Sequence, residues 1–248
     1  MRHYALIGHS LTHSLSKELF DAQGFTDADY RLCPMASLED LRQWVQQEHI
    51  DGFNVTNPYK QALVPLLDNL SPEARAIGAV NCVCVENGLL VGHNTDAPAF
   101  RQTLETILKT EHLTLDTAYI LGTGGAAHAV AYALDQLSIP YHFVSRSPEK
   151  RPNSIGYNQL STINFQQSTL LVNATPVGTY PNVDDCPLPS GFQFSILNSQ
   201  FLYDLVYNPS PTLLLRQAAA AGAMTYDGLA MLRRQAELSW KLWGLTNP

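Results

Sequence analysis

Residues 119–130 read Tyr-Ile-Leu-Gly-Thr-Gly-Gly-Ala-Ala-His-Ala-Val. An apolar, strand-like run precedes Gly122 and an apolar, helix-like run follows Ala127, so the pattern Gly122-x-Gly124-x-x-Ala127 lies at a strand-to-helix turn. Glycines in that context let the backbone turn tightly and approach a pyrophosphate, which the free N–H groups of the helix N-terminus bind. The stretch therefore predicts a dinucleotide site, and the alternative is a tight turn without a ligand.

The end of the next strand-like run indicates which dinucleotide is bound. An NAD site favours Asp or Glu there, roughly 20 residues past the first glycine. This chain instead has Ser145-Arg146-Ser147, followed by Lys150. Because a guanidinium donates well to phosphate oxygens, these residues favour the 2′-phosphate of NADP. The alternative is that Arg146 is an ordinary solvated surface charge.

Strand-like and helix-like segments alternate over the whole chain. Apolar runs typical of buried strands alternate with helix-like stretches, which predicts parallel sheets built from βαβ units and an α/β fold. The expected strands are 4–8, 30–33, 52–55, 119–122, 141–144, 169–173 and 203–207, and the expected helices are 37–47, 61–67, 97–109, 126–137, 211–221 and 228–243. Asn87-Gly88 between two alternating runs, 80–85 and 89–91, predicts a hairpin.

Composition restricts the class of protein. The 248 residues are 45% apolar and include 15 Lys and Arg against 22 Asp and Glu, a formal net charge of −7. An acidic chain without Lys/Arg runs is not expected to bind nucleic acid or anionic membranes. It contains no stretch of about 18 uncharged apolar residues and no signal peptide, so we expect a cytoplasmic protein.

Its cysteines do not indicate a metal site. Cys82 and Cys84 are two residues apart in an alternating segment, so both are expected on one face of a strand as small buried residues. That spacing is not typical of a zinc ligand pair, and no metal is predicted.

Two further segments offer ionisable groups where strands end. Lys60 closes Asn-Val-Thr-Asn-Pro-Tyr-Lys, and Asp96 closes Gly-His-Asn-Thr-Asp. Carboxyl ends of strands are where α/β proteins place ligands. Taken singly, both residues are ordinary charges at helix starts. Beside a nucleotide site they become candidates for an acid/base pair.

Nine motifs in this order resemble the shikimate dehydrogenase family over essentially the whole chain. They are His13-Ser14-Leu15-Ser16, residues 54–60, Ile77–Asn81, Asn94-Thr95-Asp96, Gly122–Ala127, Ser145-Arg146-Ser147, Asn173–Gly178, Asp204–Pro209 and Gly228–Ala236. The resemblance implies reversible, NADP-dependent reduction of 3-dehydroshikimate to shikimate in chorismate and aromatic amino-acid biosynthesis. It also implies a substrate-binding catalytic domain at 1–100, a Rossmann-like NADP domain at 101–222, and a C-terminal helix, 223–248, that packs onto the first domain.

The resemblance also implies roles for individual residues. Lys60 and Asp96 fall on the catalytic pair. Lys60 is expected to exchange the hydroxyl proton, and Asp96 is expected to orient Lys60. Substrate-binding positions are Ser14, Ser16, Thr56, Asn81, Tyr207 and Gln235. The predicted cofactor-binding positions are Gly122, Gly124, Gly125, Ala126, Ala127, Ser145, Arg146, Ser147, Lys150, Thr175, Gly228 and Met231. The expected state is a monomer or a homodimer.

The chain departs from the family pattern at several positions. Lys17 stands where Pro is usual, Phe20 where His is common, and Ala230 where Gly would let a helix start approach the nicotinamide. Two other functions stay open: a quinate/shikimate dehydrogenase that uses NAD, which Arg146 and Lys150 oppose, and a non-catalytic nucleotide sensor, which would need neither Lys60 nor Asp96.

Overall fold

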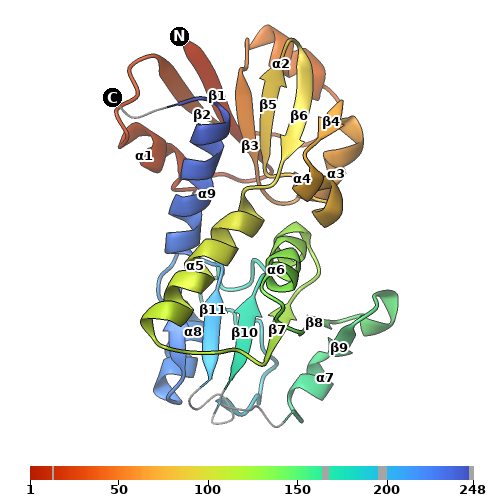
Figure 1. Ribbon diagram of the computed structural model, residues 1–248, viewed down its shortest axis with the longest axis vertical. Helices are drawn as coiled ribbons and strands as arrows, with labels where there is room; N and C mark the ends of the chain where they lie inside the picture. The colour runs from red at the N-terminus through yellow and green to blue at the C-terminus, as the bar shows by residue number, and fades with distance from the viewer. Residues whose placement is uncertain (13, 164–167, 195–199, 246–248) are drawn as a thin grey trace. The chain divides into compact units, whose positions relative to one another are not determined.

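The computed structural model describes residues 1–12, 14–163, 168–194 and 200–245. These residues form two compact units, Met1–Ala99 with Leu232–Pro248 and Phe100–Met231 (Figure 1). Both divisions fall inside helices, namely α5 (Asp96–Thr110) and α9 (Leu229–Leu242). The domain limits expected from the sequence, 100/101 and 222/223, stay predictions.

The first unit contains a six-stranded sheet in the order β2-β1-β3-β5-β6-β4. Its strands are β1 (Arg2–Gly8), β2 (Ala28–Pro34), β3 (Gly52–Val55), β4 (Asn69–Leu70), β5 (Cys82–Glu86) and β6 (Leu89–His93). β1 pairs in parallel with β2 and β3, whereas β5 is antiparallel to both β3 and β6. The hairpin predicted around Asn87-Gly88 is present, and both of these residues have a positive φ.

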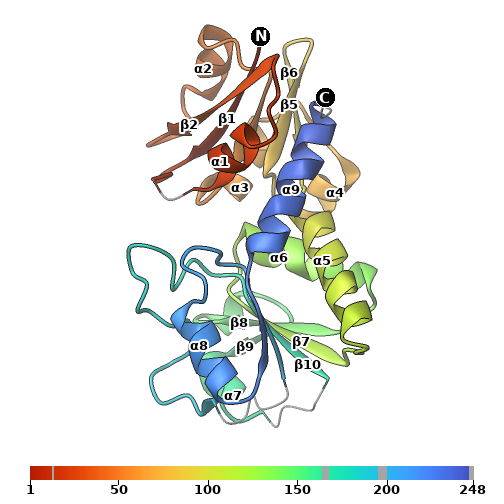
Figure 2. The same ribbon diagram turned by 90° about the vertical axis from the view of Figure 1, so that its left-hand side faces the viewer.

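Helices cover both faces of this sheet. One face packs against α2 (Leu41–Gln47), α3 (Tyr59–Ala62) and α4 (Pro72–Ile77), through residues such as Val45, Leu63 and Ala74. The other face packs against α1 (Ser16–Asp21) and α9, which lie on the same side of the sheet in Figure 2. Cys82 and Cys84 are buried together on that second face, which confirms the prediction that they share one side of a strand.

Aromatic residues in and directly after α9 pack against the sheet of the first unit. Trp243 stacks on Tyr4 with ring centroids 4.4 Å apart, and its Nε1 donates to the Val83 carbonyl at 3.1 Å. Gly52 makes room for this ring, because a Cβ there would lie 2.5 Å from Trp243 Nε1. Ala236, Trp240 and Trp243 therefore pack against one face of the N-terminal sheet.

The second unit contains a six-stranded sheet in the order β12-β11-β10-β7-β8-β9, with all pairs parallel. Its strands are β7 (Thr117–Leu121), β8 (Tyr141–Ser145), β9 (Ser154–Gly156), β10 (Thr169–Asn173), β11 (Phe201–Asp204) and β12 (Met224–Tyr226). α7 (Tyr157–Leu160) and α8 (Leu213–Ala220) pack on one face. α6 (Gly125–Gln136) follows β7, and Phe100 of α5 stacks on Tyr203 of β11. The α/β fold class is confirmed.

Some element limits differ from the prediction. The strand expected at 203–207 is Phe201–Asp204, because the Asp204 carboxylate accepts the Val206 N–H and turns the chain out of the sheet. The helix expected at 61–67 is split into α3 and a 3₁₀ turn at Val64–Leu66, since Pro65 interrupts the α-helical ladder. Short helices α1 and α4 were not predicted, because six residues give too little periodicity to read.

Among the described residues, no helix combines the length and apolarity needed to cross a membrane.

Candidate active site

Strand direction brings the first group of predicted residues together. β3 and β6 both run antiparallel to β5, so they end at the edge of the sheet where β5 begins. Lys60 follows β3, Asp96 follows β6, and Asn81 immediately precedes β5. Residues far apart in sequence therefore meet at one edge. The Val80 N–H donates to the Lys60 carbonyl at 2.7 Å and fastens the two loops to each other.

Lys60 and Asp96 form an ion pair at this edge. Lys60 Nζ lies 2.6 Å from Asp96 Oδ2, and the two side chains are 20% and 7% exposed. The carboxylate is nearly inaccessible, whereas the ammonium still meets solvent. An ammonium in this position can donate a proton to a bound oxygen atom while the carboxylate fixes its direction.

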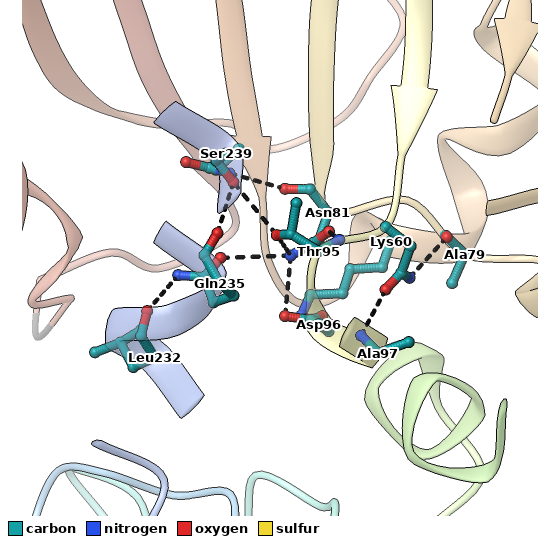
Figure 3. A network of polar contacts seen from close by, with 11 residues as sticks. Lys60, Ala79, Asn81, Thr95, Asp96, Ala97, Leu232, Gln235 and Ser239 are labelled. Carbon is teal, nitrogen blue, oxygen red and sulfur yellow. Dashed lines mark hydrogen bonds and ion pairs between the residues drawn. The ribbon is translucent and has the colours of Figure 1, made fainter. Parts of the chain in front are cut away.

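Asn81 connects this pair to the surrounding residues (Figure 3). Its Nδ2 donates to Asp96 Oδ1 and Thr95 Oγ1, both at 2.9 Å, with Gln235 Oε1 at 3.4 Å. In turn, its Oδ1 accepts the Thr95 N–H at 2.6 Å. Asp96 thus has one oxygen held by Lys60 and the other held by Asn81. The predicted residues Lys60, Asn81, Asp96 and Gln235 belong to one network.

A buried polar chain behind the pair was not predicted. Asn54 Nδ2 donates to Ser239 Oγ at 2.9 Å. Ser239 Oγ in turn lies 3.3 Å from Thr95 Oγ1 (Figure 3). The Tyr30 hydroxyl donates to Asn54 Oδ1 at 2.9 Å. Asn54 and Thr95 belong to motifs that the sequence singles out, but Ser239 lies on a helix with no local signal. Only the tertiary contact between α9 and the sheet reveals it.

The remaining substrate-binding candidates of the first unit are Ser14, Ser16 and Thr56. Ser14 Oγ accepts the Ser16 N–H at 3.2 Å, at the start of α1, and both residues are partly exposed. His13, the first residue of that motif, lies outside the described residues. Thr56 follows β3, and Gly8 makes room for its methyl group, since a Cβ at Gly8 would lie 2.5 Å from Thr56 Cγ2.

In the second unit, most of the cofactor-binding candidates lie at the carboxyl ends of the parallel strands β7, β8 and β10. Gly122 follows β7 with φ +102°, and a Cβ there would lie 2.9 Å from Thr175 Cγ2. Gly124 differs, because its backbone is extended, its residue is exposed, and a Cβ would meet no protein atom within 4 Å. Protein packing therefore explains Gly122 but not Gly124. A glycine at this position is typical of dinucleotide sites, where it lets the protein backbone approach the pyrophosphate closely.

Thr175 is fixed by a second polar network. Its Oγ1 donates to Asn173 Oδ1 at 2.7 Å, and Asn173 Nδ2 donates to Asp204 Oδ1 at 2.8 Å. The other carboxylate oxygen accepts from the hydroxyl of Thr212, the N-cap of α8, at 2.7 Å. Burial raises the pKa of Asp204 to about 6. Asn173 and Asp204 were not predicted as site residues, although both open motifs that the sequence identifies.

The basic candidates follow β8 at the same edge. Arg146 and Lys150 are exposed, while Ser145 Oγ accepts the Ser147 N–H at 3.1 Å and shapes the turn between them. Arg151 is different: its guanidinium lies 4.5 Å above the Phe143 ring and contacts His128 Nε2. Arg146 and Lys150 are therefore exposed cations at this edge, whereas Arg151 has aromatic partners within the unit.

The last predicted positions lie after β11 and at the start of α9. Tyr207 is partly buried beyond the end of β11, and Gly228 and Met231 are buried. Gly228 is required by packing, since a Cβ there would lie 2.1 Å from the Leu205 carbonyl oxygen. Ala230 is exposed in the first turn of α9.

Two of the departures from the family pattern have structural partners. Phe20 is a core residue whose ring stacks on Tyr30 with centroids 5.0 Å apart. Lys17 pairs with Asp21 at 2.7 Å on the exposed side of α1.

The residues at the carboxyl edge of β7, β8 and β10 fit a phosphorylated dinucleotide. The N-terminus of α6 presents free N–H groups behind Gly124, where no side chain fills the space. Arg146 and Lys150 supply exposed cations after the next strand. This edge of the second sheet can bind a dinucleotide. Separately, the ion pair of the first unit can exchange a proton.

The comparisons with known proteins agree with this chemistry. Residues 5–83 match the model of the shikimate dehydrogenase substrate binding domain. A shikimate dehydrogenase (NADP(+)) from Nostoc sp. is 38% identical over an alignment of 258 positions, gaps included, which covers 96% of this chain and 89% of that protein.

Solved structures resemble the fold over its full length. Shikimate 5-dehydrogenase from Thermus thermophilus in complex with NADP(H) and shikimate has a TM-score of 0.82 and 33% identity, covering 100% of this chain and 95% of that one. Quinate dehydrogenase from Corynebacterium glutamicum in complex with NAD has a TM-score of 0.79 and 28% identity, with 100% and 95% covered.

Proposed function

The chain belongs to the shikimate dehydrogenase family, and we propose from its site that it reversibly reduces 3-dehydroshikimate to shikimate with NADP. The observation that carries this proposal is the Lys60–Asp96 ion pair, joined by Asn81 at an edge where three strands meet. The reaction belongs to chorismate and aromatic amino-acid biosynthesis.

Lys60 handles the proton in this proposal. When bound, NADP supplies the hydride acceptor for shikimate oxidation and the donor in reverse. As shikimate is oxidised, the neutral amine form of Lys60 takes the proton of the reacting hydroxyl and becomes the ammonium. In reduction the ammonium gives that proton to the developing alkoxide and becomes the neutral amine. Because Asn81 and Lys60 each hold one oxygen of Asp96, the carboxylate keeps Lys60 oriented. Positioning of this kind supplies much of the rate.

Hydroxyl and amide groups bind the substrate. We assign Ser14 and Ser16, which are partly exposed, to its carboxylate, and Thr56, Asn81 and Gln235 to its hydroxyls. Thr56 lies at the start of the Lys60 loop, Asn81 contacts Asp96, and Gln235 contacts Asn81. Their donors suit an anionic substrate in a protein of net charge −7. Tyr207 stays a prediction for the carboxylate side.

The glycine turn and the basic loop bind the cofactor. Gly122, Gly124, Gly125, Ala126 and Ala127 form the turn and the first residues of α6, and Thr175 lies beside Gly122. Arg146 and Lys150, with Ser145 and Ser147, are assigned to the 2′-phosphate. Gly228 and Met231 are assigned to the nicotinamide end. A cytoplasmic location and a monomeric or homodimeric state stay predictions.

Oxidation of quinate with NAD is the second candidate function. It rests on the similarity to quinate dehydrogenase from Corynebacterium glutamicum, whose structure contains NAD. Exposed Arg146 and Lys150 oppose it, because NAD has no 2′-phosphate for them to bind.

One assay distinguishes these functions. The purified chain is given shikimate or quinate with NADP⁺ or NAD⁺, and reduced cofactor is followed by absorbance. We expect the highest kcat/KM with shikimate and NADP⁺. Lys60→Ala should lower kcat about 10²–10⁴-fold. Lys241→Ala, which removes an exposed lysine from the last turn of α9, should leave kcat unchanged.

Binding measurements complete the test. Calorimetric titration should show that Lys60→Ala still binds shikimate, which would also show that the variant is folded. Near-parent kcat in this variant would remove Lys60 from the mechanism. Absence of activity with all four combinations of substrate and cofactor would overturn the proposed function.

A further inference from the structure

A second cluster of reactive side chains lies on the hairpin β5–β6. Cys84 and Glu86 lie on β5 and His93 on β6, and one ligand atom from each lies within 4.8 Å of the other two. The hairpin register explains this arrangement. Cys84 pairs with Val91, so His93 is its diagonal neighbour on the same face, and Glu86 is the next residue of β5 on that face.

The three groups differ in burial. Cys84 is 6% exposed, His93 is partly buried and Glu86 is exposed. A cation could therefore reach the thiol and the imidazole from the side of the carboxylate. On the buried side of the cluster, Cys84 Sγ donates to the Leu242 carbonyl of α9 at 3.9 Å, so α9 covers this side.

His93 carries an unexplained polar atom. Its Nε2 is buried and has no hydrogen-bond partner within the described part of the chain. A buried ring nitrogen without a partner is costly, and a bound ion is one of the few explanations for it.

We propose that Cys84, Glu86 and His93 form a binding site for a divalent cation of the zinc type. A thiolate, an imidazole and a carboxylate are the ligands that Zn²⁺ uses, and a mixed set of this kind does not suit Ca²⁺ or Mg²⁺. In a tetrahedral zinc site the ligand atoms lie about 3.5 Å apart, so the exposed Glu86 side chain needs only a small shift. A water molecule would occupy the fourth position.

Binding replaces the thiol proton by the metal. The Cys84 S–H bond breaks, the sulfur–metal bond forms, and one proton leaves to the buffer for each thiol that is ionised. No electron is transferred. The proposed hydride chemistry does not use this site, so the two proposals can fail independently.

Metal binding to the reduced full chain tests the proposal. Zn²⁺ is titrated calorimetrically against the parent and against Cys84→Ser, Glu86→Gln and His93→Gln. We expect one site per chain and at least about 10-fold weaker binding in each variant, because even removal of an outer partner of a metal ligand has effects of that size. Cys33→Ser, Cys186→Ser and Glu39→Gln are the matched controls, since they remove the same groups elsewhere on the chain.

Cobalt provides an independent spectroscopic readout. Co²⁺ should produce a sulfur-to-cobalt charge-transfer band in the parent and in Cys33→Ser but not in Cys84→Ser. Because Glu86 is exposed, Glu86→Gln keeps the fold and preserves the test if Cys84→Ser unfolds. Zinc binding by the parent that is no tighter than binding by the triple variant Cys84→Ser/Glu86→Gln/His93→Gln would overturn the proposal.

Discussion

Asn173 donates from Nδ2 to Asp204 Oδ1 at 2.8 Å, at the ends of the adjacent strands β10 and β11. The same asparagine accepts from the hydroxyl of Thr175, and the same aspartate accepts from Thr212 at the start of α8. One buried carboxylate therefore organises two loops at the carboxyl edge of the second sheet.

The first prediction concerns the pH dependence of stability. Burial raises the folded-state pKa of Asp204 to about 6, above its ordinary value of 3.8. Between about pH 4 and pH 6 the folded state then binds more protons than the unfolded state, so this group's contribution to stability decreases as pH rises through that window. The full difference is about 3 kcal/mol, because one pKa unit corresponds to about 1.4 kcal/mol.

Urea unfolding of the parent and of Asp204→Asn measures this effect. The free energy of unfolding of the parent, minus that of the variant, should fall between pH 4 and pH 6 and be level above pH 7. Other titrating groups cancel in the difference. A difference that does not change with pH would show that Asp204 stays ionised in the folded protein.

The second prediction concerns Gly124. A Cβ at this position meets no protein atom, and its extended backbone is open to alanine. Gly124→Ala should therefore change the free energy of unfolding by less than about 1 kcal/mol, because the entropic gain of alanine is opposed by the preference for glycine at the N-cap of α6. It should weaken NADP⁺ at least about 10-fold, since the methyl group blocks the approach of the pyrophosphate.

Gly156→Ala is the matched control for Gly124→Ala. Gly156 also has an extended backbone before a helix, and its nearest atoms lie 3.8 Å from the added Cβ. Calorimetric titration with NADP⁺ should show parent affinity for this variant. If Gly124→Ala binds NADP⁺ as the parent does, the pyrophosphate is not bound beside this glycine.

The sequence predicted those features that depend on local pattern. Alternation predicted the strands at 52–55 and 169–173 with the limits observed, and Asn87-Gly88 predicted the hairpin. The contact between Lys60 and Asp96 could not follow from their spacing of 36 residues. It depends on the antiparallel insertion of β5 between β3 and β6, and the family resemblance supplied it instead.

Features that depend on tertiary contact were not predictable in the same way. Ser239 contacts Asn54 because Trp240 and Trp243 pack α9 against the first sheet. His93 approaches Cys84 only through the hairpin register. The apolar residues around Asp204 predicted a strand that continues to residue 207. The strand ends at Asp204 instead, because the Asp204 carboxylate accepts the Val206 N–H.

The third prediction separates substrate binding from cofactor binding. Ser14→Ala and Ser16→Ala should each raise the KM for shikimate about 10- to 100-fold, the effect of one hydrogen bond to a charged group. The KM for NADP⁺ should not change. Steady-state kinetics with each ligand varied in turn provides the measurement. Ser37→Ala, another exposed serine of the first unit, is the control. An increase confined to the KM for NADP⁺ would show that the assignment of the two units is wrong.

The last prediction concerns the choice of cofactor. Arg146 is exposed beyond the end of β8, and only NADP has a phosphate group for its guanidinium to bind. Arg146→Ala should therefore weaken NADP⁺ about 10- to 150-fold and leave NAD⁺ nearly unchanged. Lys150→Ala should have a smaller effect in the same direction, and the double variant should lose more than either single one.

Arg151→Ala distinguishes phosphate binding from a general effect of charge. Arg151 carries the same charge on the same loop but lies against Phe143 and His128, so its removal should affect stability more than cofactor preference. Added salt should weaken NADP⁺ more than NAD⁺ in the parent, since exposed charges are screened over about 10 Å at 0.1 M salt. Equal weakening of both cofactors in Arg146→Ala would mean that the residue supports the adenosine site. Unchanged binding of both would make it an ordinary solvated charge.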